Sequence, residues 1–299
     1  MQYQRPARVE IDLGAIGNNL RTIKGLLRPG TLFMAVVKAD GYGHGAVRVA
    51  NEALAAGADR LGVALPEEGV ALRRAGIKAP IQILGEIHPS ASGLILEHDL
   101  TASICSAAVA DALGPEAARR SKEALVHIKV DTGMNRLGLP AGDAPDFLDY
   151  LKKYPFLKVE GIFTHFACAD DPAYGYSAKQ LERFSELLLR LESAGHTFSL
   201  KHAANSAATI FHRQAHLDMV RIGIALYGLH PSEATKGKID LEPALSLVSA
   251  VSQVKEISSG EGASYSLTYR AEKDGRLALL PMGYGDGYTR LLSNKVEAR

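Results

Sequence analysis

The sequence has only two cysteines, almost no net charge and no apolar run long enough to span a bilayer. Cys105 and Cys168 are too few and too far apart for a disulfide framework or a metal knuckle, so we expect a reducing compartment. The N-terminus lacks the apolar segment of a signal peptide. A formal net charge of +1 without basic clusters argues against nucleic acid as the main partner. We therefore expect a cytoplasmic protein whose partners are neither nucleic acid nor membrane.

The chain does contain a regular alternation of apolar, strand-like runs and amphipathic, helix-like segments. With 299 residues, it can form one large α/β domain, or one such domain and a smaller one. Helix-like segments include 47–57, 67–76 and 177–195, and Gly57 and Gly195 stand where helix C-caps are expected. The predicted strands are 32–39, 60–64, 81–85, 101–104, 126–130, 159–166, 200–205 and 219–223.

Eight strand–helix units predict an α/β fold of the (β/α)8 TIM-like barrel type. A doubly wound open sheet is the alternative, and the lack of a G-x-G-x-x-G motif after the first strand weakens it. The barrel is expected over residues 11–230, followed by a polar linker at about 231–239. Apolar and polar residues then alternate, as in 248–254, and 276–281 predicts a further strand. Residues 240–299, with 1–10 contributing a strand, therefore predict an incomplete, mainly antiparallel β domain.

Lys38 stands where the first apolar run meets a glycine-rich segment, AVVKADGYGHG at 35–45. A lysine at the end of a buried strand is poorly hydrated, which favours the neutral amine, a nucleophile that can form a Schiff base with an aldehyde. Gly41, Gly43 and Gly45 would let the backbone approach a ligand closely. The alternative is a strand-end lysine that extends to solvent before an ordinary loop.

Polar residues recur at the carboxyl ends of the predicted strands, where barrels carry their chemistry. After the seventh strand, Asn205 and Ser206 offer a hydroxyl and backbone N–H groups at a helix start, and Gly223 and Ile224 follow the eighth. Barrels often bind phosphate at these two loops. A lysine at strand one that faces such a phosphate site suggests pyridoxal phosphate. The other polar residues at these ends are Asp40, Tyr42, Lys129, Asp131, His165 and Arg221.

Each of these residues has a simpler interpretation when it is taken alone. His165 could be a structural histidine, and Ser206 could be only a helix cap. Lys129 and Arg221 could be charges paired inside the barrel. The Asp-Asp-Pro at 170–172 could suggest a metal, but it is more typical of a turn, so we expect no metal. Their coincidence at one barrel mouth favours the functional interpretation.

The motifs of this chain, in their order, closely resemble those of bacterial alanine racemases, which are pyridoxal-phosphate enzymes of the barrel fold type. The resemblance runs from residue 10 to the last residues. The motifs that carry it are EIDL at 10–13, AVVKADGYGHG at 35–45, KVDTGMNRLG at 129–138, THFA at 164–167, NSAA at 205–208, RIGI at 221–224, YGLHP at 227–231 and Ser264-Tyr265.

The resemblance implies a role for each matching residue. Lys38 would hold pyridoxal 5'-phosphate and act as one of two bases, and Tyr265 would be the opposite base, in the partner subunit's site. Arg221 would bond to the pyridine nitrogen, with His165 behind it. Tyr42, Ser206, Gly223 and Ile224 would hold the phosphate, and Asn205 would be a further cofactor-binding residue.

Two further residues have implied roles next to the cofactor. Arg136 would support the substrate carboxylate. Lys129 matches a lysine that is carbamylated in several family members, and a carbamate there would orient Arg136.

The chain departs from the family pattern in two places. The residue after the catalytic tyrosine is usually glycine, and here it is Ser266, which we expect to matter little because serine adopts many turn conformations. Family members also continue through a Cys-Met-Asp stretch that contacts substrate and a later tyrosine at the phosphate, and this sequence stops before both. The resemblance therefore implies a C-terminally truncated member.

The function implied is an isomerase, an alanine racemase that interconverts L-alanine and D-alanine for peptidoglycan as a head-to-tail homodimer with shared sites. Two alternatives stay open. One is a racemase of broader, serine-type specificity, and the other is a truncated protein that binds pyridoxal phosphate without catalysis. The presence of Tyr265 favours a racemase, because a mere binder needs no base on the second face of the substrate.

Overall fold

A computed structural model describes residues 5–171 and 173–297 of the chain. The predicted strand contribution of residues 1–4, the turn at Pro172 and the charged end at 298–299 lie outside the described residues. The chain divides into two compact units. One unit spans Asp12–Ala244, and the other joins the described residues up to Ile11 with those from Leu245 onward.

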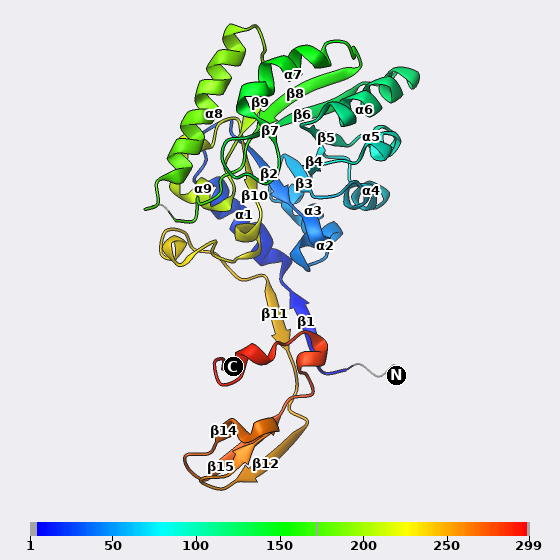
Figure 1. Cartoon of the computed structure of the whole chain (residues 1–299). Coiled ribbons are helices and arrows are strands. Elements are labelled where there is room, and N and C mark those ends of the chain that lie inside the picture. The colour runs from blue at the N-terminus through cyan, green and yellow to red at the C-terminus, as the bar shows by residue number, and fades with distance from the viewer. Residues whose placement is uncertain (1–4, 172, 298–299) are drawn as a thin grey trace. The chain divides into compact units, whose positions relative to one another are not determined.

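The larger unit is a barrel of parallel strands surrounded by helices (Figure 1). The neighbouring strands run in the order β10-β2-β3-β4-β5-β6-β8-β9, and the short β7, Leu139–Pro140, pairs with β6. Backbone bonds from Asp218 N to Lys201 O and from Arg221 N to Ala204 O, each 3.0 Å long, connect β9 with β10 and nearly close the barrel. The strands are β2 Leu32–Val36, β3 Arg60–Val63, β4 Ile81–Glu86, β5 Thr101–Ile104, β6 Ala124–Asp131, β8 Leu157–Phe163, β9 Leu200–His202 and β10 Met219–Ile222.

These strands confirm the predicted barrel, and several of them end earlier than the sequence indicated. The sixth, for example, ends at Phe163 instead of residue 166. The first ends at Val36 instead of residue 39, because the chain turns sharply at Lys38. The seventh ends at His202 instead of residue 205, because Asn205 already caps the next helix. Because the first and the seventh strand end early, the polar residues that follow them lie at the mouth of the barrel.

The helices pack outside the strands, and glycines end several of them as predicted. Gly57 and Gly195 have φ values of 107° and 84°, a left-handed conformation that glycine adopts without steric cost. The helices are α1 Leu13–Lys24, α2 Lys38–Tyr42, α3 Ala46–Ala55, α4 Pro66–Arg74, α5 Ser92–Glu97, α6 Ala107–Arg119, α7 Ala144–Leu151, α8 Tyr176–Ser193 and α9 Ser206–Phe211. Within the described part of the chain, none of the helices has the length and apolar character needed to cross a membrane.

The main core lies between the helices and the outward-facing strand residues, for example Ile16 and Leu20 of α1 with Phe33 and Ala35 of β2. A second, smaller cluster unites Met34, Leu200 and Met219. Since Leu200 and Met219 are the first residues of their strands, this cluster forms an apolar layer at the amino-terminal end of the barrel.

Residues 231–239, predicted as a linker, contain a short 3-10 turn at Glu233–Thr235 and belong to the barrel unit. Thr235 is fully buried, and Ile239 is part of the main core. Just after this segment, the backbone of Glu242 is bound by Asn19 of α1. The amide of Asn19 donates to Glu242 O at 2.8 Å, and its Oδ1 accepts from Glu242 N at 2.8 Å.

The smaller unit consists of short antiparallel sheets. Strand β1, Arg8–Ile11, pairs with β11, Leu245–Val248, so the N-terminal strand shares a sheet with the first strand that follows the barrel unit. Strand β12, Gln253–Ile257, pairs with β15, Gly275–Leu279, and β13, Gly262–Ala263, pairs with β14, Tyr269–Arg270.

Candidate active site

A cavity of about 350 Å³ collects almost all of the predicted site residues. Its size falls within the range of small-molecule sites. The residues come from the carboxyl ends of strands or the loops that follow them, as expected for a barrel enzyme. Ten of them were predicted from the sequence: Lys38, Tyr42, Lys129, Arg136, His165, Asn205, Ser206, Arg221, Gly223 and Ile224.

Lys38 opens a turn of left-handed helix in the glycine-rich segment. Ala39, Asp40 and Tyr42 have φ values of 51°, 50° and 54°, a conformation that costs a non-glycine residue about 1–2 kcal/mol. The carboxylate of Asp40 accepts from Ala46 N at 2.8 Å, and Glu68 accepts from Ala39 N at 2.6 Å. These bonds hold a reversal that brings both Lys38 and Tyr42 to the cavity, and such strain is typical of functional sites.

The loops after β9 and β10 form a small polar cradle. Asn205 caps α9, because its Oδ1 accepts from Ala208 N at 3.0 Å, so Ser206 is free of the capping role. The hydroxyl of Ser206 instead accepts from Gly223 N at 3.0 Å and thereby joins the two loops. Beside them, burial raises the pKa of Tyr42 further above neutral pH, and its protonated hydroxyl can donate a hydrogen bond. Donors of this kind suit a phosphate group.

Gly223 is required in this cradle because a side chain there would meet Tyr42. An added Cβ would lie 2.6 Å from Tyr42 Oη. The Tyr42 ring also packs against that of Tyr227, with the ring centroids 4.8 Å apart. We expect Gly223→Ala to weaken binding of pyridoxal phosphate at least about tenfold, which corresponds to about 1.4 kcal/mol. Equilibrium dialysis measures this affinity, and Gly142→Ala is the matched control because its Cβ would enter open space. Equal affinities of the two variants would contradict the cradle.

The cavity is strongly cationic. Lys38, Lys129, Arg136 and Arg221 line it, and Asp170 is the carboxylate among its lining residues. In residues 5–171 and 173–297, no carboxylate lies within ion-pair distance of Lys129 or Arg221. Their pairing inside the barrel, the simpler interpretation, is therefore wrong. Unpaired cations around a cavity favour an anionic ligand.

Lys129 is 6% exposed, and burial together with Arg221 and Arg136 lowers its pKa to about 7. The unfolded chain keeps this proton up to about pH 10.5. Between these values the unfolded state binds more protons, so stability falls as the pH decreases from about 10.5 to about 7. The neutral amine present above pH 7 is the form that can react with carbon dioxide.

We expect Lys129→Met to remove this dependence. The free energy of unfolding of the wild type should fall relative to that of the variant by about 1.4 kcal/mol for each pH unit below about 10. Urea unfolding in buffer free of carbon dioxide, at several values from about pH 7 to 10, measures the difference. Lys158→Met, at an exposed lysine, is the control. Parallel curves for the wild type and Lys129→Met would rule out a depressed pKa.

Arg221 is 3% exposed and is fixed by acceptors on several sides. The two hydrogens of its Nη2 are shared among three acceptors, Thr164 O at 2.8 Å, Ala203 O at 2.9 Å and His165 Nδ1 at 3.1 Å. Burial lowers the pKa of Arg221 to about 9, so it stays charged at neutral pH. Burial and the cation of Arg221 hold the pKa of His165 well below its usual value, which leaves a neutral acceptor.

Tyr265, the predicted second base, does not line this cavity. It belongs to the smaller unit and is 74% exposed. The serines beside it, Ser264 and Ser266, have φ values of 62° and 63°. Glycine adopts this conformation without steric cost, so the serine at 266 does carry strain that the usual glycine of the family would avoid.

Sequence reasoning missed a set of polar residues inside the barrel. His127 and His202 are fully buried next to Arg221 and Lys129. His127 precedes Lys129 by two positions on β6, and this period-two spacing places both on the same face of the strand, a signal that could have been used. Near the predicted turn at 170–172, Asp171 accepts from Ala173 N at 3.1 Å, as a turn residue does.

The fold and the cavity define a (β/α)8 barrel enzyme with a lysine, an anion cradle and a cationic pocket at the strand ends. Two family models match the chain: "Alanine racemase, N-terminal domain" over residues 11–231 and "Alanine racemase, C-terminal domain" over residues 244–299. The chain therefore belongs to the alanine racemase family, a family of pyridoxal-phosphate-dependent isomerases.

Individual relatives agree with this assignment. The alanine racemase of Desulfovibrio desulfuricans is 44% identical over 297 residues, which cover 99% of this chain and 80% of that protein. The crystal structure of alanine racemase from Bacillus anthracis with bound L-Ala-P has 40% identity and a TM-score of 0.87, over 98% of this chain and 76% of that one. Histidine racemase from Leuconostoc mesenteroides has 30% identity and a TM-score of 0.83, over 96% and 77%.

Proposed function

We propose that the chain binds pyridoxal 5'-phosphate in this cavity and uses it to interconvert L-alanine and D-alanine. The observation that carries the proposal is the arrangement of the cavity, in which Lys38 lines the same space as the cradle of Ser206 and Gly223. A lysine binds the aldehyde of the cofactor, and the cradle fits its phosphate. When bound, pyridoxal phosphate withdraws electrons from the substrate and makes the proton on its α-carbon acidic.

Two bases on opposite faces of the α-carbon are required, because racemisation removes a proton from one face and returns one to the other. Lys38 Nζ would serve one face. Tyr265 would serve the other, and we propose that the partner subunit of a homodimer supplies it. Within the barrel unit, Arg221 donates hydrogen bonds and accepts none, so it would leave the pyridine nitrogen unprotonated. Arg136 would bind the substrate carboxylate, and a carbamate on Lys129 would orient Arg136.

The test is an assay of D-alanine formation from L-alanine by the purified chain supplied with pyridoxal phosphate. Racemisation together with bound cofactor supports the proposal. Bound cofactor without racemisation would instead support a protein that binds pyridoxal phosphate without catalysis. Absence of both would contradict the proposal.

A substitution of Tyr265 separates the two bases. We expect Tyr265→Ala to keep the cofactor bound through Lys38 but to slow exchange of the α-proton with solvent chiefly for one enantiomer, by about 10²-fold or more. Deuterium incorporation into L-alanine and D-alanine, measured separately in heavy water, gives the two rates. Tyr174→Ala, at another exposed tyrosine, is the control. Equal loss for both enantiomers would contradict bases that serve separate faces.

A second candidate is a racemase of broader specificity. The likeness to a histidine racemase supports it, because that protein has the same fold at 30% identity. One methylene in a pocket changes discrimination by only about 1–3 kcal/mol, so a small cavity can accept related amino acids. Values of kcat/KM for alanine, serine and histidine distinguish the candidates, and values for serine or histidine that equal the value for alanine would favour the broader enzyme.

A further inference from the structure

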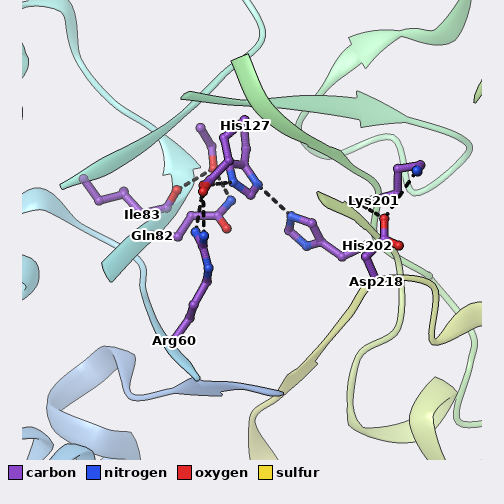
Figure 2. Close-up of polar contacts among 9 residues, drawn as sticks. Arg60, Gln82, Ile83, His127, Lys201, His202 and Asp218 are labelled. Atoms are coloured by element: carbon purple, nitrogen blue, oxygen red, sulfur yellow. Dashed lines mark hydrogen bonds and ion pairs between the residues drawn. The ribbon is translucent and has the colours of Figure 1, made fainter. Parts of the chain in front are cut away.

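A continuous row of hydrogen-bonded side chains runs through the barrel interior to Arg221. Figure 2 shows the part of the row from Arg60 to His202. It starts at Arg60 of β3, which binds both carboxylate oxygens of Glu160 at 2.7 and 2.6 Å. Glu160 lies 2.9 Å from His127 Nε2, and His127 Nδ1 lies 2.8 Å from His202 Nε2. His202 Nδ1 then lies 2.8 Å from Arg221 Nη1. We call these five residues the interior row.

Arg221 and Glu160, which flank the two histidines, determine which atom donates and which accepts in each hydrogen bond between them. Arginine only donates, so His202 Nδ1 must accept from Arg221. A neutral His202 then carries its proton on Nε2 and donates it to His127 Nδ1. His127 in turn carries its proton on Nε2 and donates to Glu160, an ionised carboxylate that only accepts. With the opposite tautomers, two donors would face each other at His202 Nδ1 and Arg221 Nη1. Two acceptors would face each other at His127 Nε2 and Glu160.

The surroundings keep the two histidines neutral and in place. Burial lowers the pKa of His127 and holds that of His202 well below its usual value. Although burial acts in the opposite sense, hydrogen bonds from His127 and Arg60 lower the pKa of Glu160 to about 2. The ring of Phe163 stacks on that of His202, with centroids 4.6 Å apart. Position 161 is glycine, and an added Cβ there would lie 2.6 Å from the His127 ring.

We propose that Glu160 is a positioning residue, which fixes the tautomers of His127 and His202 and through them the orientation of the Arg221 guanidinium at the cavity. The inference rests on the proposed function, because it concerns how Arg221 meets the bound group. Glu160 does not line the cavity. It acts through the interior row, and Arg221, at the other end of that row, does line the cavity.

The first test needs no activity and uses the full chain without cofactor, with histidine and arginine labelled with nitrogen-15. In the wild type, NMR should place the ring proton of both His127 and His202 on Nε2. A proton on Nδ1 of His202, or a doubly protonated ring, would overturn the proposal. This measurement requires no variant, and it decides the direction of the row even if the chain does not racemise alanine.

The second test uses Glu160→Gln, because an amide of nearly the same size can donate as well as accept. We expect mixed tautomers of His127 and His202 and faster exchange of the Arg221 side-chain protons with water. Glu123→Gln, which removes an exposed carboxylate near the start of β6, should leave both unchanged. Wild-type tautomers and exchange in Glu160→Gln would overturn the role of Glu160.

Kinetics of the loaded enzyme give the third readout. Misorientation of Arg221 should lower kcat for alanine by about 10-fold to 100-fold and leave KM unchanged, since Arg221 would contact the cofactor and not the substrate itself. Glu160→Asp keeps a carboxylate that only accepts and should recover part of the loss. An unchanged kcat in Glu160→Gln, or no recovery in Glu160→Asp, would contradict a positioning role.

Discussion

Replacement of Lys38 by alanine is expected to abolish covalent attachment of pyridoxal phosphate and to lower the racemisation rate by about 10³-fold or more. A general base alone contributes about 10²–10⁴-fold, and Lys38 would also hold the cofactor. We do not expect Lys129, the other lysine of the cavity, to substitute for it, because its Nζ packs 4.3 Å from the centre of the Phe163 ring. Absorbance of the bound cofactor and D-alanine formation measure the two losses.

Two controls make the result specific. Lys152→Ala, at an exposed lysine, should keep both attachment and activity. Methylamine added to Lys38→Ala should restore part of the rate, because a small amine fits the space that the side chain leaves. Attachment of the cofactor in Lys38→Ala, or activity near the wild-type value, would show that another residue holds it.

Replacement of Arg221 by glutamate should raise transamination relative to racemisation by about tenfold or more, a change of about 1.4 kcal/mol in the difference between the two barriers. An arginine keeps the pyridine nitrogen unprotonated and so weakens the electron sink, whereas a carboxylate would favour the protonated ring. The stronger electron sink should allow more side reaction. The ratio of pyruvate to D-alanine formed from L-alanine measures the partition.

Arg221→Lys is the matched control because lysine, like arginine, only donates and keeps its charge. Its activity should fall, since lysine cannot reproduce the bonds to Thr164, Ala203 and His202, but the product ratio should stay low. If Arg221→Lys and Arg221→Glu raise the ratio equally, loss of geometry and not ring protonation would explain the change.

The sequence allowed the barrel to be predicted because its strands are buried on both faces. Such strands are continuous apolar runs bounded by turn residues, and all eight were located to within a few residues. The candidate residues were located for a related reason, since the end of each strand in a barrel marks a position at the mouth. Asn205 and Gly223, for example, follow predicted strands and both line the cavity.

Other features depend on contacts that the local sequence does not contain. The left-handed turn after Lys38 places Ala39 and Tyr42 in a conformation that their residue types disfavour. Its support comes in part from Glu68, 29 residues further along the chain. The interior row similarly joins residues of five strands, and only the closed barrel brings Glu160 and Arg221 into line with the two histidines.

The most direct test of the account is to identify the lysine that holds the cofactor. The purified chain is loaded with pyridoxal phosphate, the bond to lysine is reduced with borohydride, and peptides are mapped by mass spectrometry. Lys38 and Lys129 both line the cavity, so the measurement distinguishes two real candidates. We expect that Lys38 alone carries the reduced cofactor. A label on Lys129, or on a lysine outside the cavity, would contradict it.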